Sequence, residues 1–219
     1  METNNYKDGV EEYDFSIIPL LKEGFKRSDG VKLKFLGAVI IFIVISLITH
    51  SILNFVFPST ESFANSYIKT LISAPITIPI TIGITMLGVT IAREENIEVP
   101  DIFNYYNLMF SIIVTYLTMT ALITIGFIFL VLPGIYLTIS YLFSYQLVVD
   151  KGMGTWEAME LSRKIVTKQW FKFFGLALLN GIIILISAIP LGIGLIWTIP
   201  MSYISYGLLY HHLFDDEEV

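Results

Sequence analysis

The sequence predicts an all-α membrane protein with six transmembrane helices, and its composition, its charge-free windows and its proline-glycine breaks lead to this fold class. The 219 residues are 55% hydrophobic and 15% charged, with a mean hydropathy of +0.73 and no cysteine. A soluble domain carries about 25% charged residues. The composition therefore excludes a compact soluble enzyme, a disulfide-stapled domain and a cysteine-ligated metal or redox centre.

Long stretches without charge mark the candidate spans, because a Lys, Arg or Asp at the bilayer centre costs about 2.5 to 3.5 kcal/mol. A single crossing needs about 20 apolar residues. Two windows hold one span each and two longer windows hold two spans each. The four windows cover residues 35–60, 70–92, 102–149 and 173–214.

Each long window contains a break, at Leu132-Pro133-Gly134 and at Pro190-Leu191-Gly192. Proline removes a backbone donor and glycine admits turn geometries, so both breaks predict hairpin turns at the far membrane surface. An alternative has four spans, with the long windows folded as buried or re-entrant helices. A second open point is the start of the second span, which could lie at Pro75. The six expected spans are 33–57, 67–92, 108–131, 135–149, 171–188 and 193–211.

The basic residues predict the orientation. With six spans, 12 of the 13 Lys and Arg residues lie on the side of the termini, and Lys69 lies on the other side. Short loops rich in Lys and Arg stay in the cytoplasm, so we expect both termini to be cytoplasmic; the bacterial cytoplasmic (inner) membrane is the location expected from the resemblance given below. The first 32 residues do not resemble a cleavable signal. The expected domains are a cytoplasmic tail with an amphipathic surface helix (1–32), a membrane domain (33–212) and an acidic tail (213–219).

Amphipathic segments precede the odd-numbered spans. The first places Phe15, Ile18, Leu21 and Phe25 at helical spacing, and the second begins at 99–101 with a proline at its first turn. Such segments suggest three repeats of a surface helix and a hairpin, at 14–92, 93–150 and 151–212. The simpler interpretation is the ordinary alternation of loops and hairpins.

The third amphipathic segment, at about 154–170, is the clearest. Thr155 is the expected N-cap, and Glu160 is expected to pair with Lys164. Tryptophans at the ends and basic residues between them predict a helix that lies in the headgroup plane. The expected membrane-surface anchors are Trp156, Arg163, Lys164, Lys168 and Trp170.

The run LVLPGIYL at 130–137, the apolar stretch ending at Asp150, WEAMELS at 156–162 and the basic segment up to Trp170 carry a resemblance. Together they resemble a bacterial membrane-protein superfamily that includes the membrane domain fused to some glycerophosphodiester phosphodiesterases and several uncharacterised six-helix families. The likeness covers about residues 100–212. It implies a helical integral membrane fold. It implies no phosphodiesterase activity, because chemistry in the fused proteins resides in a separate soluble domain.

Polar residues in the spans are few. His50 and Asn54 lie one helical turn apart and could share a polar pocket or proton path, although an interhelical hydrogen bond or a position near the outer interface is the preferred interpretation. Gln146 and Asn180 are expected to hold helices together first and to contact a substrate second.

The second span is the most unusual. Pro79 frees the carbonyl of Pro75, and a one-sided hydroxyl stripe of Thr77, Thr81 and Thr85 should face other helices or a hydrated cavity. Pro200 frees a second carbonyl in the last span. The two kinked helices are therefore a possible cavity or hinge, with static packing as the preferred alternative.

The expected function is non-enzymatic. An enzyme or ion-coupled transporter within the membrane normally carries ionisable residues inside its spans, and no Asp, Glu, Lys or Arg lies deep within the expected spans. The sequence also shows no cofactor, metal or nucleic-acid motif. His211 and His212, followed by four acidic residues, could chelate a divalent cation, but a frayed solvated tail is the preferred interpretation, because adjacent histidines on a helix point in different directions. The leading hypothesis is an accessory or assembly subunit of a membrane complex, with membrane lipids and another membrane protein as partners. The alternative is a carrier or conduit for a lipid or small weakly polar solute. A lipid-modifying enzyme is the least favoured hypothesis.

Overall fold

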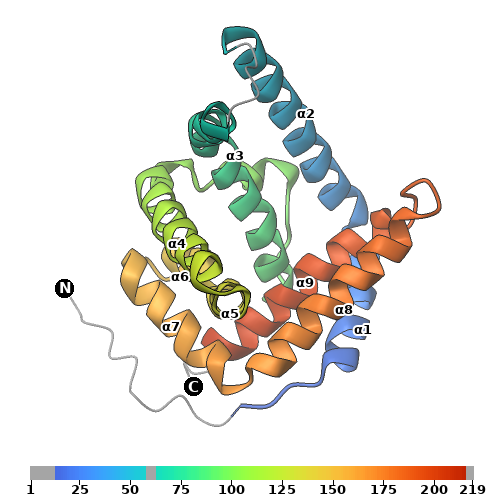
Figure 1. The fold of residues 1–219 in the computed structure, drawn as a ribbon. Coiled ribbons are helices and arrows are strands. Elements are labelled where there is room, and N and C mark those ends of the chain that lie inside the picture. Colours follow the sequence, from blue (N-terminus) through green and yellow to red (C-terminus); the bar gives the residue numbers. More distant parts are fainter. Residues whose placement is uncertain (1–12, 58–62, 216–219) are drawn as a thin grey trace.

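The computed structural model describes residues 13–57 and 63–215, and the described residues form helices and turns only (Figure 1). Residues 1–12 of the expected N-terminal tail and residues 216–219 of the expected acidic tail therefore lie outside the described residues. The α-helices are α1 (Ile17–Ser28), α2 (Lys32–Val56), α3 (Phe63–Ala92), α4 (Met109–Phe129), α5 (Val131–Ser140), α6 (Ser144–Asp150), α7 (Thr155–Lys168), α8 (Trp170–Ala188) and α9 (Leu195–Phe214), and the short 3-10 helices are η1 (Val99–Phe103) and η2 (Tyr106–Leu108).

The predicted all-α membrane class is confirmed. Five segments of the described chain are long and apolar enough to cross a membrane. The helix α9, with 20 residues, occupies the position of the sixth expected span. It carries Pro200 and, towards its end, tyrosines, serines and histidines, so its sequence is less apolar than that of the other five. The five segments are Lys32–Val56, Asn65–Ala92, Val99–Phe129, Val131–Asp150 and Trp170–Ala188.

The second span begins earlier than expected. The helix α3 starts at Phe63 and continues through both Pro75 and Pro79 as one element of 30 residues. The suggested start at Pro75 is therefore wrong. Proline within a helix removes one backbone hydrogen bond, and in a membrane neighbouring helices and threonine side chains compensate for that loss.

The chain reverses between α4 and α5, as predicted for the first hairpin, at Leu130, three residues ahead of Pro133. Leu130 is extended, with φ −163° and ψ 151°, and Pro133 stands in the first turn of α5, where its missing N–H costs nothing. The two helices touch at glycines. A Cβ on Gly134 would lie 2.4 Å from the Phe127 ring, and a Cβ on Gly126 would lie 3.1 Å from the Gly134 Cα.

The fourth expected span is not one helix. It is divided into α5 and α6, and the break lies between Ser140 and Ser144. The hydroxyl of Ser162 on α7 donates to the Ser140 carbonyl at 2.8 Å and accepts from the Phe143 N–H at 3.2 Å. The break leaves the Ser140 carbonyl and the Phe143 N–H without partners inside the helix. The buried Ser162 hydroxyl from α7 hydrogen-bonds to both groups and so stabilises the break.

The chain reverses between α8 and α9 at the predicted residues, but the turn lies beside the first half of α2 and not beside its end, where a turn at the far membrane surface was expected. Leu191 and Gly192 have φ of 53° and 77°, the left-handed conformation that glycine favours. The turn lies beside residues 36–43 of α2, and the Lys32 Nζ lies 5.6 Å from the centre of the Trp197 ring. The α8–α9 hairpin therefore runs obliquely to α2, and its turn lies nearer the beginning of α2 than its end (Figure 1).

The helix α1 lies along α9 rather than on its own. Gly24 makes this approach possible, because a Cβ there would lie 2.2 Å from the Ser205 Oγ. The expected apolar face is only partly buried: Leu21 is buried, whereas Ile18 and Phe25 are 62% and 51% exposed.

The helix α7 matches the third amphipathic segment, with two corrections. Gly154 is the N-cap and Thr155 is the first helical residue, whose hydroxyl instead pairs with Thr115 of α4 at 2.9 Å. Glu160 pairs with Arg163 at 2.7 Å rather than with Lys164. The bidentate reach of the guanidinium to the nearer residue favours this contact.

Three clusters of buried residues form the core of the described chain; the smallest consists of Met119, Tyr141 and Met159, and the other two are larger. The largest joins α3, α6, α7, α8 and α9, and its centre is Phe143, whose ring lies 5.6 to 6.0 Å from the rings of Phe173, Tyr210 and Phe214. The second joins the beginning of α2 to α3, η1 and α9. The helices α3 and α9 cross at Gly88 and Gly207, where a Cβ on Gly207 would lie 2.2 Å from the Gly88 backbone.

Candidate functional site

A cavity of about 350 Å³ opens between α3, α4, α6 and α9. Its apolar walls come from Ile78, Ile82 and Leu142. Thr81 at its edge is exposed, so the cavity opens to the surface beside α3. The polar groups that line it are Thr81, Thr85, Tyr116, Tyr145, Gln146, Tyr203 and Tyr206.

The predicted threonine stripe meets this cavity along part of its length. Thr81 and Thr85 line it, whereas Thr77 does not. Each hydroxyl donates to the carbonyl four residues earlier, at 3.1 Å for Thr77 and 3.0 Å for Thr81 and Thr85. The hydroxyl protons are therefore used by the helix itself, and only the oxygen lone pairs remain available to a ligand.

The two expected hinge prolines lie in different places. Pro79 belongs to the stretch of α3 that lines the cavity, between Ile78 and Thr81. Pro200 lines a separate groove of about 200 Å³ between α9 and α2. The cavity therefore uses the part of α9 that follows Pro200, through Tyr203 and Tyr206.

Gln146 is the most distinctive side chain of the cavity. It is 6% exposed, and its Oε1 has no hydrogen-bond partner among the described residues. A buried acceptor without a donor costs about 1 to 3 kcal/mol. The sequence singled out this residue as a contact between helices; the structure places it in the cavity lining, with its Oε1 buried and without a partner among the described residues.

Asn180 behaves as the sequence predicts. Its Oδ1 accepts a hydrogen bond of 3.0 Å from the Ser202 hydroxyl, which joins α8 to α9 in the buried interior. Its Nδ2 has no partner among the described residues. Asn180 is therefore first a packing residue.

His50 and Asn54 do not share a pocket. Both are exposed on the second half of α2. The Asn54 Oδ1 accepts a hydrogen bond of 2.7 Å from the Lys69 Nζ of α3, which links the two helices near their connection.

The expected surface anchors gather on and beside α7. Trp156 is 66% exposed, and Lys164 and Lys168 are also exposed. Trp170 is half-buried and stacks between the rings of Tyr136 and Phe174. Arg163 pairs with Glu160 and so leaves less free charge on this surface.

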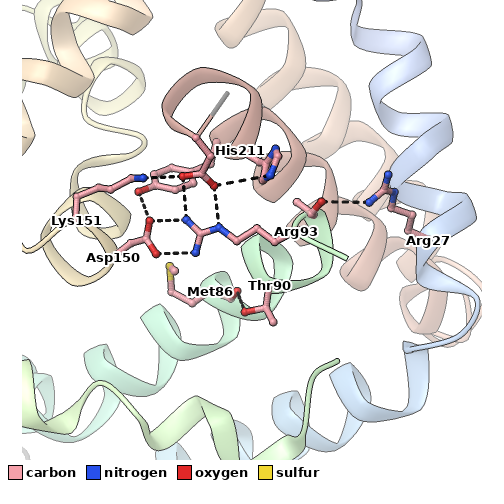
Figure 2. A network of polar contacts seen from close by, with 10 residues as sticks. Arg27, Met86, Thr90, Arg93, Asp150, Lys151 and His211 are labelled. Carbon is pink, nitrogen blue, oxygen red and sulfur yellow. Dashed lines mark hydrogen bonds and ion pairs between the residues drawn. The ribbon is translucent and has the colours of Figure 1, made fainter. Parts of the chain in front are cut away.

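A second polar feature joins the ends of α3, α6 and α9 (Figure 2). The Arg93 guanidinium donates to both oxygens of Asp150, at 2.8 and 2.6 Å, and to both oxygens of Asp215, at 2.8 and 3.0 Å. Lys151 donates to Asp215 at 2.7 Å, and the Tyr210 hydroxyl donates to Asp150 at 2.9 Å. We call these five residues the Arg93 cluster.

The charges of the Arg93 cluster serve a structural role, because they hold the ends of α3, α6 and α9 together. Hydrogen bonds that Arg93 donates to the two carboxylates raise its pKa. Burial opposes the ionisation of Asp215, but hydrogen bonds from Arg93 and Lys151 outweigh burial and lower its pKa. Two positive and two negative charges balance, and the geometry leaves no reactive group at the centre. The sequence gives no local signal of this cluster, because Arg93 lies 57 residues from Asp150 and 122 residues from Asp215.

The fold and these two features define a helical membrane protein. A comparison with protein-family models, one with curated proteins and one with solved structures give no match to this chain. The resemblance of residues 100–212 to the superfamily described above therefore stays a prediction.

Proposed function

We propose that this membrane protein is a non-enzymatic accessory or assembly subunit that binds another membrane protein through the second half of α2. The observation that carries the proposal is the position of His50. Its side chain is exposed on a helix whose candidate span is only 17% buried, and Phe55, Val56 and Phe57 follow it. The histidine therefore does not mark the end of the apolar segment.

Polar side chains that face hydrocarbon without a partner are unfavourable, and those within spans usually face another helix. His50 and the neighbouring Ser51 are both exposed, among the exposed apolar residues Leu47, Ile48 and Ile52. An imidazole presents one donor and one acceptor. A partner helix with a complementary polar residue would satisfy both groups and cover the apolar side chains around them.

We also propose that the protein lies in a bacterial cytoplasmic membrane with both termini in the cytoplasm. The Lys and Arg distribution supports this orientation. Contacts join the segments expected on that side: Tyr13 donates to the Ile165 carbonyl, Lys34 to the Ile97 carbonyl, and Arg93 to Asp215. The last contact supports an even number of crossings between α3 and the end of α9.

The experiment places a photo-crosslinking amino acid at Ser51 and, as a control, at Leu117, an exposed residue of α4. We expect a discrete adduct with another membrane protein from position 51 and none from position 117. His50→Leu should reduce the adduct, and Ile52→Leu, a change between apolar residues on the same helix, should not. Adducts with lipid alone, or with a second copy of this chain, would refute the proposal.

A second candidate function, a carrier for a lipid or a small weakly polar solute, is favoured by the cavity beside Pro79. A proline in a helix that lines a cavity gives α3 a point at which to bend. Pro79→Ala should change the flux of the solute through proteoliposomes and leave the midpoint of thermal unfolding close to wild type. Unchanged flux in a folded variant would assign Pro79 a static role.

A further inference from the structure

We infer that the α8–α9 hairpin does not cross the bilayer but lies obliquely in its cytoplasmic leaflet, where lipid acyl chains cover its exposed apolar surface. The inference rests on the proposed orientation, in which the beginning of α2 lies on the cytoplasmic side. It concerns a different surface from the one proposed for a protein partner, which lies on the second half of α2.

The turn of the hairpin lies beside the first half of α2 (Figure 1). Residues between 192 and 200 line a groove together with residues between 36 and 43, and the Lys32 Nζ lies 5.6 Å from the centre of the Trp197 ring. An α-helix rises about 1.5 Å per residue, so residues 36–43 lie about 6 to 16 Å from the beginning of α2 at Lys32. Half of the hydrocarbon thickness is about 15 Å. The turn therefore stays in the leaflet in which α2 begins.

The other end of α9 lies on the same side of the membrane. Asp215, directly after α9, pairs with Arg93, directly after α3, and Tyr210 donates to Asp150. Both ends of α9 thus lie in one half of the bilayer, although the helix has 20 residues and a length of about 30 Å. A leaflet is about 20 Å deep with its headgroups, so the axis of α9 is inclined by about 45° or more from the membrane normal.

The charged helix α1 lies against the middle of the hairpin. Gly24 packs on α9 so closely that a Cβ there would lie 2.2 Å from the Ser205 Oγ, and Lys22 lines a groove between α1, α8 and α9. The helix α1 carries four charged residues between positions 22 and 27. Length and composition alone would let α8 cross a membrane, but a crossing hairpin would carry these charges to the bilayer centre, where they are strongly unfavourable. An oblique hairpin keeps them at the level of the headgroups.

The exposed surface of the hairpin is apolar. No Asp, Glu, Lys or Arg lies from residue 173 to residue 214. Leu185, Ile189 and Leu191 are 71%, 79% and 96% exposed. Ile40 and Ile43 on the first half of α2 are exposed as well, so the apolar surface continues from the hairpin to a candidate span. The acyl chains that surround this span therefore also cover the hairpin, as they cover other apolar surfaces that enter one leaflet.

The chain contains no cysteine, so single cysteines report on its topology. The variants are Leu191→Cys at the turn and two exposed controls, Gly30→Cys between α1 and α2 and Ser66→Cys near the beginning of α3. A membrane-impermeant maleimide is added to right-side-out and to inside-out vesicles. It should label Ser66→Cys from the outside only and Gly30→Cys from the inside only.

Leu191→Cys should stay at the level of the cysteine-free wild type from both sides, because a thiol in apolar surroundings does not form the reactive thiolate. It should label after denaturation in SDS, which shows that the thiol is intact. Thermal unfolding monitored by tryptophan fluorescence confirms that each variant is folded.

Photo-crosslinking amino acids at two positions measure the depth and the surroundings of the hairpin. From Ile196, which lines the groove beside α2, crosslinks should form to residues 36–43 and not to residues 50–56. From Leu185 the adducts should be with lipid.

Labelling of Leu191→Cys from either side, or crosslinks from position 196 to residues 50–56, would overturn the inference. Adducts of position 185 with another protein in place of lipid would overturn the assignment of acyl chains to this surface. If Gly30→Cys and Ser66→Cys exchange sides, the proposed orientation fails, whereas the crosslinks from position 196 still report whether the hairpin crosses the bilayer.

Discussion

Replacing Arg93 with methionine tests the Arg93 cluster most directly. The side chains of Asp150 and Asp215 are only 12% and 15% exposed, and Arg93 is 25% exposed. Methionine keeps an unbranched side chain but removes every donor, so two largely buried carboxylates lose their main counter-charge. Breaking a fully buried pair costs about 3 to 5 kcal/mol. Because these groups retain some solvent and Asp215 retains Lys151, we expect a loss of about 2 to 4 kcal/mol.

The assay is thermal unfolding in mild detergent, followed by tryptophan fluorescence. A loss of that size lowers the midpoint by about 5 to 15 °C in a chain of this length. Arg163→Met is the control, because its pair with Glu160 is about one-third exposed at both ends and lies within one helix. Such pairs contribute at most about 0.5 kcal/mol. Adding Asp150→Asn to Arg93→Met should recover part of the loss, since the stranded charge is removed.

If Arg93→Met and Arg163→Met lower the midpoint equally, the ends of α3, α6 and α9 are not held by this cluster. Full additivity of Arg93→Met and Asp150→Asn would lead to the same conclusion, because residues in one network should couple.

Three further predictions concern the same packed interior. The pKa of Asp215 is lowered in the folded state, so its ionised carboxylate stabilises the fold above its ordinary pKa of 3.8, and this contribution is lost as the pH falls below that value. The midpoint of thermal unfolding should therefore decrease in that range. Asp215→Asn should make the decrease smaller. Ser162→Ala removes the hydroxyl that hydrogen-bonds to the backbone at the break between α5 and α6, and it should lower the free energy of unfolding by about 1 to 3 kcal/mol. Unchanged amide hydrogen exchange at the break would contradict this prediction. Gly207→Ala places a Cβ against Gly88 and should cost about 1 to 3 kcal/mol. Gly181→Ala, which meets nothing within 4 Å, should be neutral or stabilise α8 by up to about 1 kcal/mol. Equal midpoints for the two glycine variants would refute the close crossing.

Parts of the candidate sites were predictable. The threonine stripe, Pro79, Gln146 and Asn180 stand out because polar and proline residues are rare in apolar spans. Their separation into a cavity residue, Gln146, and a packing residue, Asn180, was not predictable, because both are amides in similar surroundings along the chain. The Arg93 cluster joins positions 57 to 122 residues apart, so spacing gave no indication of it.

The sequence by itself determined the membrane class, the extent of most helices and both chain reversals. In a bilayer each segment must satisfy its own backbone, so local hydropathy, charge and proline-glycine pairs are sufficient. The tertiary structure alone decided the break at residues 141–143, the oblique position of the α8–α9 hairpin and the unpaired acceptor of Gln146. Each of these depends on a side chain from a distant helix, such as Ser162 or Trp197, and on how closely two helices can approach. Such contacts follow from packing in three dimensions, which no local pattern encodes.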